Sequence, residues 1–206
     1  MIASVAAFNA VPLAGALWLG WDVTLLMLLY WAENVAAGVF IAVRMIASGV
    51  ANGAGGLGVM TIGVPFLILH YGAFCAVHLL IVTTAFLGAP TPSALDSGAV
   101  FAEGPALLWK SQALWGLAAL VAPQALSTVA WLRRGEAKRG DPAAHMGRRY
   151  AVTVLLHLAI ILTGALAVAL GQPLWSVVVL VATKTAWDLW SETRRGRALL
   201  GSAQAA

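Results

Sequence analysis

Long apolar runs, separated by short polar or charged stretches, set the pattern of this chain. Six of these runs reach the roughly 20 residues that a helix needs to cross the hydrocarbon core of a bilayer. They cover approximately residues 2–19, 22–44, 60–87, 107–132, 150–170 and 173–191. The pattern predicts an all-α, polytopic membrane protein, a bundle of about six transmembrane helices that forms one domain over residues 1–206.

The composition of the chain supports this prediction. Hydrophobic residues make up 61% of the chain and charged residues 10%, which is more apolar surface than a soluble domain of 206 residues buries. No basic stretch precedes the first run, so we expect a retained helix and not a signal peptide. The single cysteine, Cys75, excludes an internal disulfide.

Basic residues gather where the apolar runs end. Residues 133–149 hold six lysines and arginines against two acids, and the tail at 192–206 is also basic, whereas residues 88–105 carry acids and no base. Since positive charge marks the cytoplasmic side of a membrane, we expect a cytoplasmic loop at 133–149 and a short cytoplasmic tail. Both termini would then lie inside, in a multi-pass protein of the cell inner (cytoplasmic) membrane. The same rule explains the net charge of +4 without a nucleic-acid partner.

One motif points to nucleotide binding by its letters alone. Residues 53–58, GAGGLG, match G-x-G-x-x-G. In a dinucleotide fold this motif follows a strand and precedes an acidic residue about 20 positions later, and the sequence predicts neither here. We therefore expect no nucleotide cofactor and interpret these residues as a flexible cytoplasmic turn between the second and third helices.

A carboxylate lies deep inside the second predicted span. Glu33 is eleven residues from both Asp22 and Arg44, which corresponds to roughly 16 Å along a helix in either direction. Lys184, on the sixth span, lies at a similar depth by the same arithmetic. The sequence therefore predicts a Glu and a Lys near the middle of the bilayer.

Histidines and an aspartate fall at neighbouring depths. His70 and His78 lie on either side of the middle of the third span. Because eight residues turn a helix through about 800°, the two side chains point about 80° apart and could face one interior. His157 and Asp188 fall on the cytoplasmic side of the midplane of the fifth and sixth spans. Four helices thus contribute ionisable groups at similar depths.

The cost of these groups predicts that they face one another. A charged side chain at the membrane centre costs about 2.5–3.5 kcal/mol on insertion scales, so we expect them in the bundle interior. Carboxylate and imidazole are ligands for zinc, iron and manganese, and a divalent metal would compensate buried carboxylates. The first hypothesis is a metal site formed by Glu33, His70, His78, His157 and Asp188. Supporting residues would be Tyr30, Asn34, Tyr71 and Lys184.

Two alternatives use the same residues. A proton-coupled transporter or a channel-like pathway would let Glu33 and the histidines change protonation. A structural or assembly subunit would use them only to fix helix packing, and Lys184 and Asp188 could neutralise each other as an i, i+4 pair. The sequence contains no H-E-x-x-H or G-x-S-x-G motif and predicts no specific enzyme reaction. We expect the lipid bilayer as partner and leave open a homo-oligomer or a membrane complex.

Four short motifs carry a resemblance to a known family. They are YWAEN (30–34), HYGAFCAVH (70–78), RRYAVTVLLH (148–157) and KTAWD (184–188). In these the chain resembles an uncharacterised family of small prokaryotic polytopic membrane proteins with Y-W-x-E-N and H-Y-G-x-F-x-x-x-H motifs. The resemblance implies no known activity. It implies a shared site built from Glu33, His70, His78, His157, Lys184 and Asp188.

Overall fold

Three long helices form the described structure. The computed structural model describes residues 11, 12, 14, 15, 18–86, 105–109, 113–139 and 186. Its helices are α2 (Val23–Ala51), α3 (Gly53–Phe86) and α6 (Leu114–Arg133), followed by the short 3-10 helix η1 (Glu136–Lys138). Each long helix is long and apolar enough to cross a membrane. The fold of the described residues is therefore all-α, and the chain is a multi-pass membrane protein.

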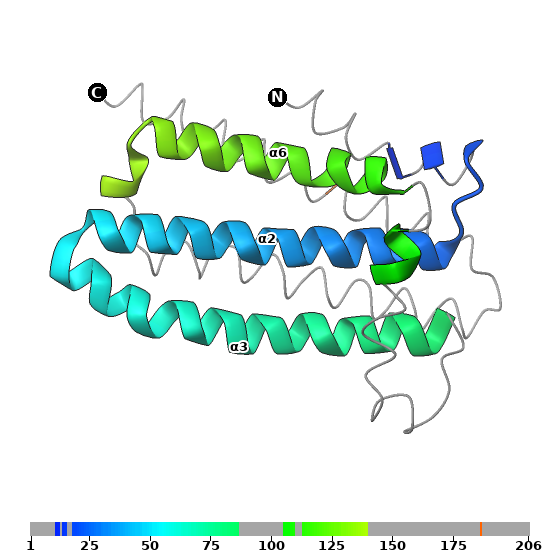
Figure 1. Ribbon diagram of the computed structural model, residues 1–206, viewed down its shortest axis with the longest axis horizontal. Coiled ribbons are helices and arrows are strands. Elements are labelled where there is room, and N and C mark those ends of the chain that lie inside the picture. Colours follow the sequence, from blue (N-terminus) through cyan, green and yellow to red (C-terminus); the bar gives the residue numbers. More distant parts are fainter. Residues whose placement is uncertain are drawn as a thin grey trace.

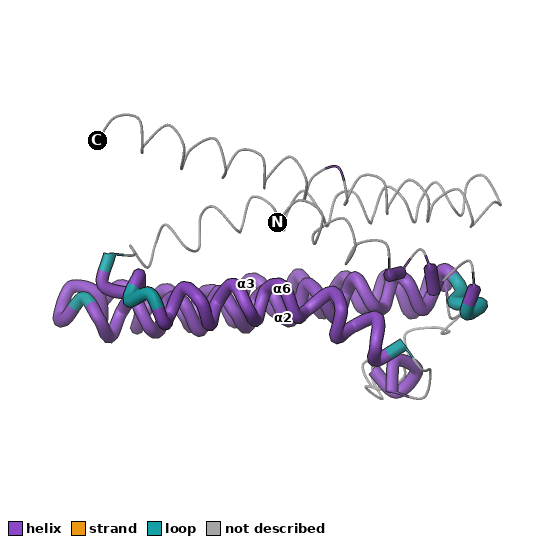
Figure 2. Tube along the Cα trace, turned by 90° about the horizontal axis from the view of Figure 1, so that it is seen from above, coloured by secondary structure: helices purple, strands orange, loops and turns teal. Residues whose placement is uncertain are grey.

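Helix α2 lies between the other two helices (Figure 1). It forms an antiparallel hairpin with α3, and it runs in the same direction as α6, with which it shares contacts from Trp21 and Gly116 to Asn52 and Ala137. Seen from above, the three helix axes follow one common direction (Figure 2). The C-terminal ends of α2 and α6 and the N-terminal end of α3 therefore meet at one end of the structure.

The hairpin between α2 and α3 is tighter than the sequence predicts. Asp22 caps the start of α2, because its Oδ1 accepts a hydrogen bond of 2.8 Å from the backbone N–H of Leu25. Asn52 ends the helix by donating from its side chain to the Ser48 carbonyl at 2.8 Å. At Gly53 the backbone has a φ of +65°, which glycine adopts without strain, and α3 begins there.

The interpretation of residues 53–58 as a flexible turn is wrong, because these residues form the first turns of α3. Glycine serves close packing here. A Cβ on Gly56 would lie 2.6 Å from the Gly49 carbonyl oxygen, and a Cβ on Gly49 would lie 2.6 Å from Met60 Cβ. Small residues at such positions let two membrane helices approach closely, so the hairpin closes without a loop.

Two apolar clusters hold the helices together, with a gap between them on α2. The first cluster packs Trp21 and residues 25–30 of α2 against Leu79, Val82 and Leu120. The second packs Ile41 and Met45 against α3. Glu33 and the buried Asn34 lie between the two clusters. The helices therefore place a polar layer between two apolar ones.

Three of the six predicted spans fall on described helices, with shifted ends. The second span continues past Arg44 to Ala51, the third begins at Gly53 rather than residue 60, and α6 begins at Leu114 rather than residue 107. Charge and glycine ended the predicted spans, whereas the backbone hydrogen bonding of a helix continues beyond the apolar stretch. The span at 2–19 lies mostly outside the described residues, and the spans at 150–170 and 173–191 lie outside them except for residue 186. The number of spans and the cytoplasmic position of both termini stay predictions.

Candidate functional site

The central contact of the polar layer joins Glu33 of α2 to Gln124 of α6. Gln124 Nε2 donates a hydrogen bond of 3.3 Å to Glu33 Oε1. Glu33 lies ten residues into α2, about 15 Å from its first residue at helical rise. The carboxyl group thus lies well inside a candidate span and reaches across the interface between two helices.

Gln124 is a site residue that the sequence interpretation missed. That interpretation considered ionisable side chains and passed over a neutral amide. A sequence signal existed, because the polar residues Gln124, Ser127 and Thr128 and the aromatic Trp131 follow the i, i+3, i+4, i+7 spacing of one helix face. In the structure this face of α6 packs on α2, as the contacts of Gln124, Ser127 and Thr128 with α2 demonstrate.

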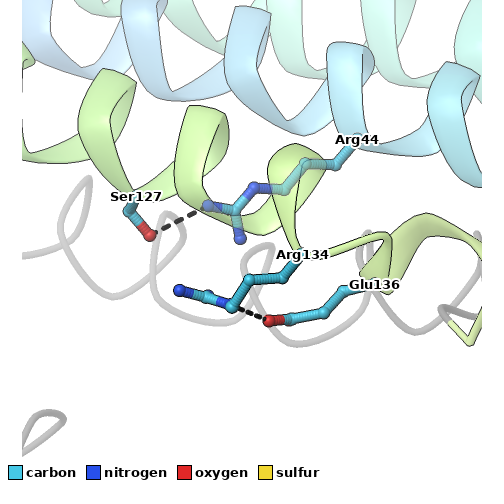
Figure 3. Close-up of polar contacts among 4 residues, drawn as sticks. All are labelled: Arg44, Ser127, Arg134 and Glu136. Carbon is cyan, nitrogen blue, oxygen red and sulfur yellow. Dashed lines mark hydrogen bonds and ion pairs between the residues drawn. The ribbon is translucent and has the colours of Figure 1, made fainter.

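Arg44 forms a second contact on the same face of α2. Eleven residues turn a helix through about 1100°, so Arg44 lies on the same side as Glu33, three turns further along. Its Nε donates to Thr128 Oγ1 at 3.1 Å and its Nη2 donates to Ser127 Oγ at 3.0 Å. Figure 3 shows the side chain reaching from α2 across to α6.

The sequence predicts that the second span ends at the basic residue Arg44. In the structure the Arg44 side chain is instead surrounded by groups of α6. Its guanidinium carbon lies 5.5 Å from the ring centroid of Trp131, within the range of a cation–π contact. The end of the bundle carries further charge: Arg133, Arg134, Lys138 and Arg139 are exposed. Glu136 forms an ion pair with Arg134 there (Figure 3).

The predicted supporting residues Asn34 and Tyr71 join α2 to α3. The Tyr71 hydroxyl donates a buried hydrogen bond of 2.7 Å to the backbone carbonyl of Asn34. Gly38 makes room for the ring, since a Cβ there would lie 2.6 Å from Tyr71 Cε1. Trp31 Nε1 donates to the Cys75 carbonyl at 2.8 Å. Tyr71 therefore holds α3 against the backbone of α2, and its supporting role at a metal site stays a prediction.

Tyr30 and Cys75 both lie in the apolar clusters. Tyr30 is 1% exposed and belongs to the first cluster, and Cys75 is buried in the second. The place of Cys75 is that of a packing residue, in agreement with the usual role of a lone membrane cysteine.

The two histidines of α3 do not share one interior in the described structure. His78 is 2% exposed, whereas His70 is exposed. The His70 ring lies between Phe66 and Phe74, with ring centroids 5.2 Å apart in both pairs. One side chain is therefore buried and the other exposed, although the two point only about 80° apart around the helix.

The predicted metal ligands are only partly covered by the described residues. His157, Lys184 and Asp188 lie outside them. Within the part of the chain that the structure describes, no three His, Cys, Asp or Glu side chains gather into a group that could hold a metal ion. Zinc, iron or manganese at the full predicted set stays a prediction.

Comparison with known proteins shows what the chain is similar to. A family of unknown function, DUF6498, matches residues 1–205. No curated protein and no solved structure matches the chain. The match confirms one part of the expected resemblance, namely that the chain falls in a family of unknown function and that this family covers the chain. The side-chain chemistry of the polar layer is therefore the basis for its proposed function.

Proposed function

The chain belongs to DUF6498, a family of unknown function, and we propose that its membrane domain forms a proton pathway centred on Glu33. The observation that carries this proposal is the Glu33 carboxyl group, which lies inside a candidate span and reaches across to Gln124 of α6. A carboxyl group can take up and release a proton at this position. Ionisable residues at membrane depth are typical of functional sites, among them ion pathways and proton relays.

A purely structural role would not require an acid. An amide at position 33 would make the same contact to Gln124, and it would avoid the cost of about 2.5–3.5 kcal/mol that a charge carries at the membrane centre. Tyr71 and Trp31 illustrate this, because they join α2 to α3 with neutral hydrogen bonds. The acid at the α2–α6 interface is therefore better explained by the ability of a carboxyl group to take up and release a proton.

The α2–α6 interface also indicates the side of the membrane to which the proposed pathway leads. Beyond Gln124, the polar face of α6 continues with Ser127 and Thr128. These two hydroxyls accept hydrogen bonds from Arg44, which lies roughly 16 Å further along α2 than Glu33 does. Beyond it lies the basic end of the bundle around Arg133 and Lys138. By the positive-inside rule this end faces the cytoplasm, so the proposed pathway connects Glu33 to the cytoplasmic side.

The test is proton flux into liposomes that contain the purified full-length protein and a trapped pH-sensitive dye. A potassium gradient with valinomycin supplies the driving potential. We expect the wild type to acidify the lumen faster than protein-free liposomes do, and Glu33→Gln to return the rate to the protein-free value. Glu136→Gln is the matched control, since this carboxyl lies at the basic end outside the spans, and its rate should equal that of the wild type. A wild-type rate equal to that of protein-free liposomes would overturn the proposal.

The metal hypothesis makes a different prediction for the same protein. If Glu33, His70, His78, His157 and Asp188 hold a divalent metal, elemental analysis finds roughly one equivalent of zinc, iron or manganese, and Glu33→Gln or His70→Ala lowers it. Under the proton pathway, Glu33→Gln abolishes flux whatever the metal content. Measuring both quantities on one preparation separates the two hypotheses.

A further inference from the structure

Four basic side chains lie exposed within a short segment at the end of α6, residues 133–139, which we call the basic segment. They are Arg133, Arg134, Lys138 and Arg139. The one acid within these residues is Glu136, which forms an ion pair with Arg134 (Figure 3). Four positive charges and one negative charge give the basic segment a net charge of +3.

The basic segment is folded against the helices. After Arg133 ends α6, Gly135 adopts a φ of +67°, which glycine tolerates, and the chain turns into η1. The Asn52 side chain donates a hydrogen bond of 3.1 Å to the Ala137 carbonyl, and η1 contacts both α2 and α6. The four basic side chains are therefore held at the end of the structure where the α2–α3 hairpin closes (Figure 1).

The length of α6 relates the basic segment to the surface of the membrane. Trp115, near the start of α6, is 82% exposed. Arg133 lies eighteen residues later, which is roughly 27 Å along a helix and close to the ~30 Å thickness of the hydrocarbon core. Tryptophan, lysine and arginine are typical of the two membrane–water interfaces. With Trp115 at one interface, the basic segment lies at the level of the lipid headgroups of the other.

We propose that the basic segment is a docking surface for anionic phospholipids, whose phosphate groups bind Arg133, Lys138 and Arg139. The charges are complementary, and clusters of at least four Lys and Arg residues next to a membrane helix are typical of anionic headgroup binding. A guanidinium group can donate to two phosphate oxygens at once. Because Arg134 is paired with Glu136, the other three cations supply the surface. This inference goes beyond the proton pathway and does not depend on it.

A role in membrane topology alone makes a different prediction. The positive-inside rule concerns the insertion of the chain and needs only positive charge on one side. It predicts no preference among lipids once the protein is folded. A docking surface predicts a local excess of anionic lipid at the basic segment and no comparable excess at the other end of α6.

Photo-crosslinking in nanodiscs measures this local preference on the purified full-length protein. The nanodiscs consist of phosphatidylcholine with a small share of a photoreactive lipid, either phosphatidylglycerol or phosphatidylcholine, with the reactive group at the same acyl-chain position. Mass spectrometry quantifies crosslinks on the peptide with the basic segment and on the peptide with Trp115. At the basic segment we expect phosphatidylglycerol to exceed phosphatidylcholine about fivefold, since a basic residue near an anionic surface contributes about 1 kcal/mol. The ratio at Trp115 should be lower.

Substitutions within the basic segment should move the ratio in both directions. The triple variant Arg133→Gln, Lys138→Gln, Arg139→Gln leaves only the Arg134–Glu136 pair, so the ratio should fall toward that at Trp115. Glu136→Gln keeps every basic residue and with it the insertion signal, and it raises the net charge to +4, so the ratio should rise. Sodium chloride at 1 M should lower the wild-type ratio, because the screening length falls to about 3 Å.

Three results would contradict the docking surface. The first is a wild-type ratio at the basic segment no higher than at Trp115, and the second is a ratio that neither the triple variant nor Glu136→Gln changes. The third is competition by inorganic phosphate beyond that of sodium chloride at equal ionic strength, which would assign the surface to a soluble phosphate. The measurement involves no proton gradient, so a protein without proton flux can still support the docking surface.

Discussion

The hairpin of α2 and α3 offers a matched pair of substitutions, Gly55→Ala and Gly56→Ala, on neighbouring residues of one helix. A Cβ on Gly56 would lie 2.6 Å from the Gly49 carbonyl oxygen and 2.9 Å from Asn52 Cβ, whereas a Cβ on Gly55 meets nothing within 4 Å. Alanine in place of glycine gains about 0.5–1 kcal/mol inside a helix. At Gly56 this gain is opposed by an overpacking cost of about 1–3 kcal/mol, since backbone atoms cannot swing aside.

We therefore expect Gly55→Ala to be as stable as the wild type or more so, and Gly56→Ala to be less stable than Gly55→Ala by about 1–3 kcal/mol. Reversible unfolding of the purified protein in mixed micelles, followed by circular dichroism, measures the difference. The comparison cancels the helix propensity, because both residues lie in the first turns of α3. Equal stability of the two variants would refute the close approach of Gly56 to α2, and it is the result expected of a flexible turn at residues 53–58.

Two further substitutions test the interfaces of α2 with its neighbours. Tyr71→Phe removes only the hydroxyl that donates to the Asn34 carbonyl, and unfolding measurements should find a loss of about 0.5–1.5 kcal/mol; no loss would mean that this bond does not hold α3. Arg44→Lys keeps the charge but loses the fork of donors to the two α6 hydroxyls and the contact with the Trp131 ring. We expect it to cost about 0.5–2 kcal/mol, while Arg139→Lys, at an exposed position, should leave the melting temperature unchanged.

The two interfaces of α2 use different chemistry. Against α3 it packs glycines and rigid rings, with neutral hydrogen bonds from Tyr71 and Trp31 to backbone carbonyls. Against α6 it uses longer side chains, the carboxyl of Glu33 and the guanidinium of Arg44. Glu33 and Arg44 of α2 therefore both contact α6.

The sequence by itself determined the helical class and the membrane setting. Apolar runs of about 20 residues leave helices as the economical way to satisfy every backbone hydrogen bond in lipid. It also marked Glu33 as a residue that needs an explanation, because its depth follows from helical rise alone. His78 was marked in the same way, and the structure buries it.

Only the tertiary structure decided which side chains meet. Spacing along a helix fixes the angle between His70 and His78, but not which of them is buried. It gives no reason to pair Glu33 with Gln124, which lies 91 residues later on a helix that must first dock in register. It also ends a span at Arg44, although the helix continues and α6 supplies two hydroxyls for that guanidinium. The depth of a side chain in the membrane is a local property that the rise per residue determines. The neighbours that the side chain meets depend on how helices distant in sequence pack against one another.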